Sequence, residues 1–177
     1  MKVTHPDKVS ALCVDCGICC SGILFGKATI GVEEVDFARS IGLHAWVDPV
    51  EGGDKGRFAL PCLHLCGTAC GRYGEPRPSV CSGFFCELAL RLDRDEIALA
   101  DAAGAVSQTW EVHRQLAPLI GPDQNLKSLR DSAQQLDSAP DDRHEAQRLL
   151  LVAALNRLLD RHFLPPQENQ SGRVESA

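Results

Sequence analysis

No cysteine follows Cys86 in this 177-residue chain, although nine occur up to that point. Aromatic residues are also scarce, at 5% of the composition, so a buried core has to rely on leucine, alanine and valine. No stretch approaches the roughly 20 apolar residues that a membrane-spanning helix requires. The N-terminal residues lack the apolar run of a signal peptide. We therefore expect a cytoplasmic protein with no membrane partner.

A surplus of positive charge is missing as well, because the net charge is −6. Binding along a nucleic-acid backbone depends on lysine and arginine side chains that displace counterions, so no nucleic-acid partner is expected. The sequence contains no recognisable Ser–His–carboxylate arrangement, phosphate-binding loop or glycine-rich nucleotide motif. It therefore offers no candidate catalytic residue and leaves open whether the protein is an enzyme.

The cysteines that are present form two blocks separated by about 40 residues. The first block is Cys13-Val-Asp-Cys16-Gly-Ile-Cys19-Cys20, and the second contains Cys62, Cys66, Cys70, Cys81 and Cys86. Disulfides are the usual alternative for a cysteine-rich chain, but they are rare in a reducing cytoplasm, and an odd count leaves one thiol unpaired. The pattern instead predicts that the two blocks meet in space and hold metal.

Sulfur ligands suit zinc, copper(I) and iron–sulfur clusters, because all three select soft thiolate donors. The run Cys13-x-x-Cys16-x-x-Cys19 has the spacing of a bacterial ferredoxin, and the same spacing serves zinc. Cys20 follows Cys19 directly, and neighbouring side chains usually point apart. Two four-coordinate sites, or one multinuclear site, are therefore both compatible with the number of thiols, and the metal stays open between zinc and an iron–sulfur cluster.

We expect an α+β protein, in which residues 1–88 form a small cysteine-rich metal-binding domain with short strands. Residues 89–164 are expected to form a helical subdomain, and residues 165–177 a disordered tail. The expected strands lie in 22–30, 43–50 and 56–60, and the expected helices in 31–41, from 84 onward, in 101–117, from 123, and from Asp141 or Asp142 to about 163. The segment 67–83 is expected to be a loop. The leucine-rich face of the last helix is expected to be core or a surface for a protein partner.

The cysteine pattern resembles the YkgJ-type cysteine-cluster family, which is described as chelating zinc or iron. The resemblance rests on both blocks in order: Cys13-x-x-Cys16-Gly-x-Cys19-Cys20, Pro61-Cys62-x-x-Leu65, and Cys70-x-x-Tyr73-x-x-x-Arg77-Pro78-x-x-Cys81-x-x-Phe84-x-Cys86. The second block is also similar to flagellin lysine N-methylases. The chain departs from the family pattern at Arg72, at Ser82 and by one additional residue before the Arg-Pro pair.

This resemblance implies a metal-ligand set of eight thiols: Cys13, Cys16, Cys19, Cys20, Cys62, Cys70, Cys81 and Cys86. Cys66 has no clear counterpart in the family, so it stays outside the set as a ninth ligand, a relay or a buried apolar residue. His64 is either a ligand or a hydrogen-bond partner of the site. The expected function is a metal-binding protein. An iron–sulfur enzyme or subunit, for electron transfer or support of methyl transfer, and a metal storage or delivery protein are the alternatives.

Overall fold

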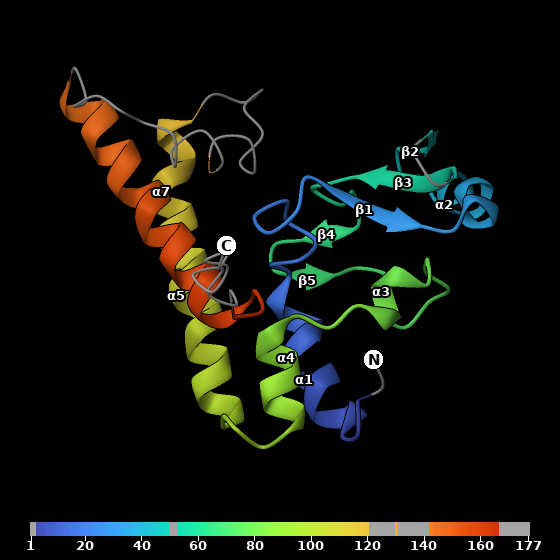
Figure 1. The fold of residues 1–177 in the computed structure, drawn as a ribbon, viewed down its shortest axis with the longest axis horizontal. Helices are drawn as coiled ribbons and strands as arrows, with labels where there is room; N and C mark the ends of the chain where they lie inside the picture. The colour runs from blue at the N-terminus through green and yellow to red at the C-terminus, as the bar shows by residue number, and fades with distance from the viewer. Residues whose placement is uncertain (1–2, 50–52, 121–129, 131–141, 167–177) are drawn as a thin grey trace, which may run out of the picture.

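The computed structural model describes residues 3–49, 53–120, 130 and 142–166. The fold is α+β, with small antiparallel sheets on one side and a group of helices on the other (Figure 1). The α+β prediction is therefore confirmed. In the part of the chain just given, no helix is long and apolar enough to cross a membrane.

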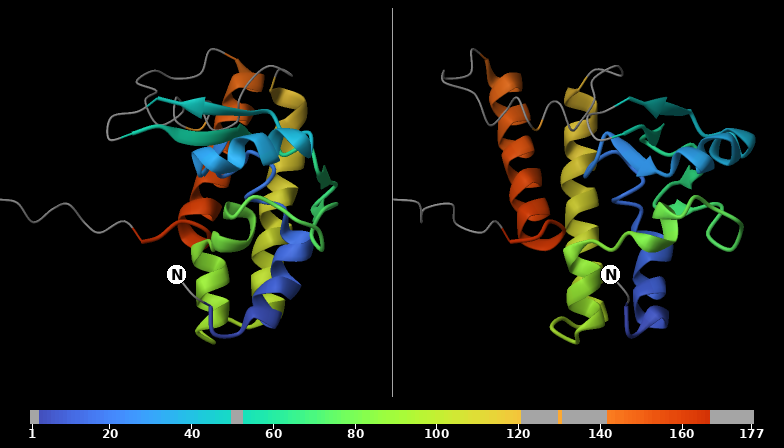
Figure 2. Two further views of the ribbon diagram at one scale, coloured as in Figure 1. Left: turned by 90° about the vertical axis from the view of Figure 1, so that its right-hand side faces the viewer. Right: turned by 45° about the vertical axis from the view of Figure 1, so that its right-hand side comes forward.

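The helical layer consists of α1 (Pro6–Cys16), α4 (Glu87–Asp93), α5 (Leu99–Leu116) and α7 (Arg143–His162), with the short η2 (Ala117–Leu119) extending α5. α5 and α7 run side by side, and α1 lies against α4 and α5 (Figures 1 and 2). Buried side chains from all four helices join one hydrophobic core. This core includes side chains of α1, so residues on both sides of the expected boundary at residue 88 pack together.

α7 shows how the sequence specifies these helices. The Asp142 side chain accepts a hydrogen bond of 2.7 Å from the backbone N–H of Glu145, which satisfies one of the free N–H groups at the helix start. Val152, Leu155 and Leu159 recur at helical spacing and are fully buried. Each such side chain contributes about 1.5–3 kcal/mol of apolar burial. The helix predicted from Asp141 or Asp142 to about 163 is therefore confirmed, with Asp142 as its cap, and its apolar face is mainly core.

The second layer is a three-stranded antiparallel sheet made of β1 (Lys27–Ile30), β2 (Ala45–Asp48) and β3 (Lys55–Ala59), in the order β1-β3-β2. Ala28 on β1 and Ala45 on β2 both lie opposite Phe58 on β3, which places the three side chains in one row. After the short 3₁₀ helix η1 (Val32–Glu34), α2 (Val35–Ser40) contributes Val35 and Ala38 to a separate, smaller core on the sheet. Phe25 packs against both cores.

The second cysteine block connects the two layers. It contains a short hairpin of β4 (Leu65–Cys66) and β5 (Ala69–Cys70), followed by the one-turn helix α3 (Val80–Gly83). This segment was expected to be a loop up to residue 83. A hairpin forms because Gly67, at φ +64°, adopts the left-handed conformation that closes the tight turn between the strands.

The remaining predicted strands and helices can be compared with the elements of the structure. Strands at 22–30, 43–50 and 56–60 correspond to β1, β2 and β3, and the expected helix at 101–117 corresponds to α5. α1 was not predicted. The helix expected from Asp123 and the tail from residue 167 lie outside the described residues. A buried Arg130 donates to the Ile23 carbonyl at 2.8 Å and to the Asn156 amide oxygen at 2.5 Å, which joins the first half of the chain to α7.

Candidate functional site

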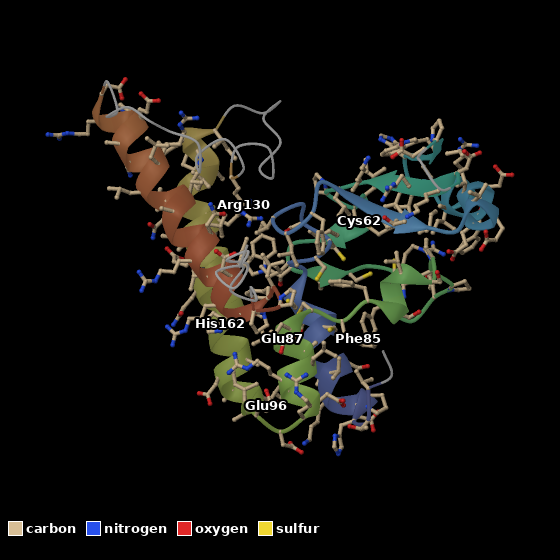
Figure 3. All side chains as sticks on the ribbon, viewed as in Figure 1. Cys62, Phe85, Glu87, Glu96, Arg130 and His162 are labelled. Carbon is tan, nitrogen blue, oxygen red and sulfur yellow. The ribbon has the colours of Figure 1, made fainter. Side chains whose placement is uncertain are left out.

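A pocket lined by eight thiols lies where the two layers meet. Cys62, which Figure 3 labels, is one of its lining residues. Its cavity measures about 130 Å³. The cysteines that line it are Cys13, Cys16, Cys19, Cys20, Cys62, Cys70, Cys81 and Cys86, which are the eight implied by the family resemblance. Cys66 does not line this pocket and is exposed to solvent. The structure thus brings the two sequence blocks to one place.

The first block is positioned by the end of α1. Cys13 and Cys16 lie in the last turn of this helix, which ends at Gly17 in the left-handed conformation, φ +61°. The Trp110 indole on α5 donates a 2.7 Å hydrogen bond to the Cys16 carbonyl, so the helix end is tied to the helical layer. After Gly17 the chain turns sharply, and Cys19 and Cys20 follow within the turn, where the Cys20 N–H donates to the Gly17 carbonyl at 3.0 Å.

The hairpin β4–β5 packs directly against this turn. A Cβ atom added at Gly17 would lie 2.4 Å from the Thr68 carbonyl oxygen, so only glycine allows the two backbones to approach this closely. The Cys62 N–H donates to the Cys20 carbonyl at 2.8 Å, which places the beginning of the second block beside the end of the first. Two close backbone approaches therefore align the blocks.

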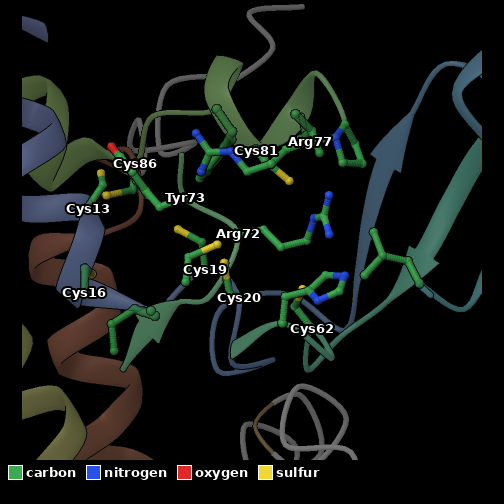
Figure 4. Close-up of a pocket in the computed structure, with 18 of the residues that line it drawn as sticks. Cys13, Cys16, Cys19, Cys20, Cys62, Arg72, Tyr73, Arg77, Cys81 and Cys86 are labelled. Carbon is green, nitrogen blue, oxygen red and sulfur yellow. The ribbon is translucent and has the colours of Figure 1, made fainter. Parts of the chain in front are cut away.

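Cys86 reaches the pocket from the start of α4. The next residue, Glu87, donates its backbone N–H to the Phe163 carbonyl at 3.1 Å, so α4 begins at the C-terminal end of α7. In Figure 4, Cys86 and Cys13 lie at one end of the pocket and Cys81 and Cys62 at the other.

Four of the thiols influence one another at the end of the pocket near α1 and α4. Burial raises the pKa of Cys13 to about 11, and the neighbouring Cys86 adds to the rise. Burial likewise raises the pKa of Cys16 to about 12, with additions from Cys86 and Cys13. Cys19 donates a hydrogen bond to Cys86, which raises the pKa of Cys19 and lowers that of Cys86 to about 7. We call Cys13, Cys16, Cys19 and Cys86 the helix thiol set.

The other four interact in the same way at the opposite end. Burial raises the pKa of Cys20 to about 12, and the other three thiols of this group, Cys62, Cys70 and Cys81, add to the rise. Burial raises the pKa of Cys81 to about 11, with additions from Cys62 and Cys70. We call Cys20, Cys62, Cys70 and Cys81 the loop thiol set. Because Cys20 also raises the pKa of Cys16 and of Cys19, the two sets meet at the Cys19-Cys20 pair.

Backbone N–H groups point at three of the sulfur atoms, each from the residue two positions further along the chain. The N–H of Ile18 lowers the pKa of Cys16, although burial outweighs this effect. The N–H of His64 acts on Cys62 in the same manner. The N–H of Leu88, after stronger effects from the Cys19 thiol and the Ala89 N–H, helps to lower the pKa of Cys86. Such donors stabilise sulfur in its thiolate form.

Two arginines supply positive charge to the pocket (Figure 4). The Arg77 guanidinium lies 4.4 Å from the centre of the Tyr73 ring, and its charge lowers the pKa of Cys13 in one set and of Cys20 in the other. The Nε atom of Arg72 is buried and has no hydrogen-bond partner within the described residues, while the same guanidinium pairs with Glu75 at 2.8 Å. An unpaired buried donor beside eight sulfur atoms is suited to a thiolate acceptor.

His64 also lines the pocket. Its ring Nε2 lies 2.8 Å from the Ile41 carbonyl, an acceptor, so Nε2 carries the proton and Nδ1 of the neutral ring keeps a lone pair. Ligation through Nδ1 and a supporting role both stay open for this residue. His113, by contrast, packs edge-on against Trp110 at 5.3 Å on α5 and does not line the pocket.

Within the described residues, no group of three or more His, Cys, Asp or Glu side chains is arranged so that it could hold a metal ion as placed. Binding of a metal would therefore require thiols around the pocket to move from these positions. Comparisons with protein families, curated proteins and solved structures found no match to the chain.

Sequence analysis missed α1, which carries two of the eight thiols. Signals for it were present: Pro6 at the first helical position, apolar Val9 and Leu12 three residues apart, and Gly17 after the last turn.

Proposed function

We propose that this chain is a metal-binding protein in which the eight pocket thiols hold metal as two four-thiolate sites, one for each thiol set. The observation that carries the proposal is that Cys86 acts on the pKa of Cys13, Cys16 and Cys19 in one part of the thiol-lined pocket, while Cys62, Cys70 and Cys81 act on the pKa of Cys20 in the other. Four thiolates complete the tetrahedral ligand set of zinc and equally the ligand set of an iron–sulfur cluster. The motif resemblance to the YkgJ-type family supports metal binding by the same eight thiols.

The division gives the adjacent pair Cys19-Cys20 a physical role. Cys19 hydrogen-bonds to Cys86 in the helix set, whereas Cys20 has Cys62, Cys70 and Cys81 as its neighbours in the loop set. Side chains of consecutive residues usually point apart, so a Cys-Cys pair can serve two separate sites. One multinuclear site is the alternative, in which the pair would bridge metal ions.

The raised thiol pKa values are consistent with a site that needs a cation. Burial and mutual repulsion keep most of these thiols protonated when no metal is bound, and bound metal would displace the protons. A four-thiolate zinc site carries a net charge of about −2, which requires nearby N–H donors and positive side chains. The N–H groups of Ile18, His64 and Leu88 and the guanidinium of Arg77 would supply them. A reducing compartment such as the cytoplasm would keep the thiols free to bind.

The first test is elemental analysis with an absorption spectrum on protein purified without oxygen. We expect either two zinc ions per chain in a colourless protein, or iron and sulfide with absorbance in the visible range. The second result would favour the iron–sulfur enzyme or subunit over a zinc module. Protein that contains neither metal as purified, and takes up neither on reconstitution, would contradict the proposal.

Paired substitutions then separate two sites from one. Cys16→Ser with Cys86→Ser removes two ligands of the helix set, and Cys62→Ser with Cys81→Ser removes two of the loop set. Each pair should lower the bound metal to about half of the wild-type content. Cys66→Ser, outside the pocket, is the matched control and should leave the content unchanged. If either pair removes all of the metal, the thiols form one multinuclear site.

A further inference from the structure

A second cavity lies behind the loop thiol set and has a different chemistry. It measures about 280 Å³ and lies between β1, β3 and α3. Aromatic and aliphatic side chains supply most of its wall: Phe25, Phe58, Leu60, Val80 and Phe84. Sulfur supplies a further part of the wall, because Cys19 and three members of the loop set, Cys20, Cys62 and Cys81, line this cavity as well as the first. Three consecutive residues of β1, Lys27, Ala28 and Thr29, complete the lining.

The cavity is held open by contacts at both ends of α3. Before the helix, the Glu34 carboxylate accepts hydrogen bonds from the Ser79 backbone N–H at 2.6 Å and from its hydroxyl at 2.8 Å. After the helix, the Phe84 ring packs edge-on against the Phe25 ring, with 5.4 Å between the centroids. The roof of the cavity is thus attached to the sheet layer on both sides, as expected for a preformed binding site.

The side chains around this cavity offer water few hydrogen-bond partners. Its polar side chains come from β1, and both have partners elsewhere: the Lys27 ammonium pairs with Asp48 at 2.9 Å, and the Thr29 hydroxyl accepts from Arg57. An ordered water requires two to four polar partners, whereas an apolar molecule requires only contact area. Displacing weakly held water by an apolar molecule is favourable.

We propose that this cavity binds a small apolar molecule the size of a bicyclic aromatic, packed against the sulfur atoms of the loop thiol set. A cavity of about 150 Å³ lined by aliphatic and aromatic side chains binds benzene, so roughly twice that volume fits two fused rings. Polarisable sulfur makes favourable contacts with aromatic rings. This inference goes beyond the metal-binding function and does not depend on it.

The probe for the test is 2-naphthol, added to the purified full-length protein. Saturation-transfer NMR should detect binding, with a dissociation constant of about 0.1–1 mM, a range reasonable for a ligand of this size. In protein with labelled alanine methyl groups, the signal of Ala28, which lines the cavity, should shift on addition of the probe. The signal of Ala45, in the same cross-strand row but outside the cavity, should stay in place.

Substitutions that fill the cavity give a second measurement. Ala28→Leu on the floor and Val80→Phe on the roof should each weaken binding of 2-naphthol at least tenfold. Ala45→Leu is the matched control, because it adds the same side chain to the same face of the sheet and should leave the affinity unchanged. Either filling variant suffices if the other does not fold, and the alanine signals of the wild-type protein need no variant.

Lack of saturable binding by the wild-type protein, or binding that shifts neither alanine signal, would overturn the proposal. Equal affinity of the filled and control variants would overturn it too. Metal content is measured on the same samples. A chain that binds the probe but takes up no metal on reconstitution would contradict the proposed function alone, and a metal-loaded chain that does not bind the probe would contradict the cavity alone.

Discussion

Arg77 is the residue whose charge reaches both thiol sets. It stacks on Tyr73 and lowers the pKa of Cys13, Cys20 and Cys81, so it offsets negative charge on both sides of the Cys19-Cys20 pair. A lysine would keep the charge but lose the planar contact with the ring.

We therefore expect Arg77→Gln to weaken metal binding about tenfold, in the range usual for residues that support metal ligands. Arg77→Lys should give an intermediate loss. Competition with a chromophoric chelator measures both. Arg39→Gln, which removes an exposed partner of Asp36, is the control and should bind as the wild type does. Wild-type affinity of Arg77→Gln would show that Arg77 only packs against Tyr73.

Asp93 is a second residue with a defined electrostatic role. Its carboxylate accepts hydrogen bonds from the backbone N–H of Thr4, at 2.8 Å, and of His5, at 2.6 Å, which holds the start of α1 against α4. These bonds lower the pKa of Asp93 in the folded protein below its ordinary value, and the Thr4 N–H contributes most. The carboxylate therefore stabilises the fold above the ordinary aspartate pKa of about 3.9, and this contribution disappears as the pH falls through the lower folded pKa.

Because the lowered pKa of Asp93 stabilises the fold at neutral pH, we predict that Asp93→Asn lowers the urea midpoint at pH 7. The difference in urea midpoint between Asp93→Asn and the wild type should become smaller at strongly acid pH. Asp36→Asn, which changes an exposed aspartate in an ion pair with Arg39, should have little effect at either pH. A difference that stays constant from pH 7 down to acid conditions would mean that charge on Asp93 is not the cause.

At the scale of elements, the contact between the end of α1 and the β4–β5 turn can be tested with two glycines of similar conformation. Gly17 has φ +61° and no room for a Cβ atom, whereas Gly67 has φ +64° and nothing within 4 Å of the Cβ position. Alanine at either position should cost about 1–2 kcal/mol for left-handed backbone. Gly17→Ala should cost about 1–3 kcal/mol more, because the Thr68 carbonyl has to move.

Urea unfolding of both variants against the wild type measures these costs. Both alanines incur the same cost for a left-handed backbone. The difference between their free energies of unfolding therefore reports the close approach of Gly17 to the Thr68 carbonyl. Equal destabilisation by the two alanines would mean that the hairpin moves away from Gly17 freely.

The same elements explain what the sequence could and could not predict. The helix from 142 was predictable because Asp142 begins it and its leucines recur at helical spacing. The hairpin was not, since strands of two residues have no periodic pattern to detect. The motif resemblance anticipated which eight thiols line the pocket. Their division into two sets was not predictable, because Cys86 joins Cys13 only through the packing of α1 against α4.

At the scale of the whole molecule, the chain contributes to one core from both ends. Buried Val9 and Leu12 of α1 join the same core as Leu155 and Leu159 of α7, so the first helix is stabilised without metal. Between residues 62 and 81, by contrast, regular structure is limited to a hairpin of two-residue strands and the start of a one-turn helix.

We predict that metal removal increases amide hydrogen exchange mainly in 62–81, while α1, α5 and α7 keep their protection. Hydrogen exchange with mass spectrometry on metal-loaded and chelator-treated protein measures this, and protein reloaded with metal is the control. If α1 loses protection together with 62–81, the fold depends on metal throughout its first half.

The hydrogen bond from Trp110 to the Cys16 carbonyl gives the protein an internal optical reporter. The indole emission depends on the polarity and hydrogen bonding around its N–H. This N–H is hydrogen-bonded to Cys16, whose thiol lines the pocket. A movement of the Cys16 sulfur that shifts the backbone of this residue would therefore change the hydrogen bond to the indole. Phenylalanine at Trp46, on the distant strand β2, would leave Trp110 as the chain's remaining tryptophan and make events at the helix end visible without any added label.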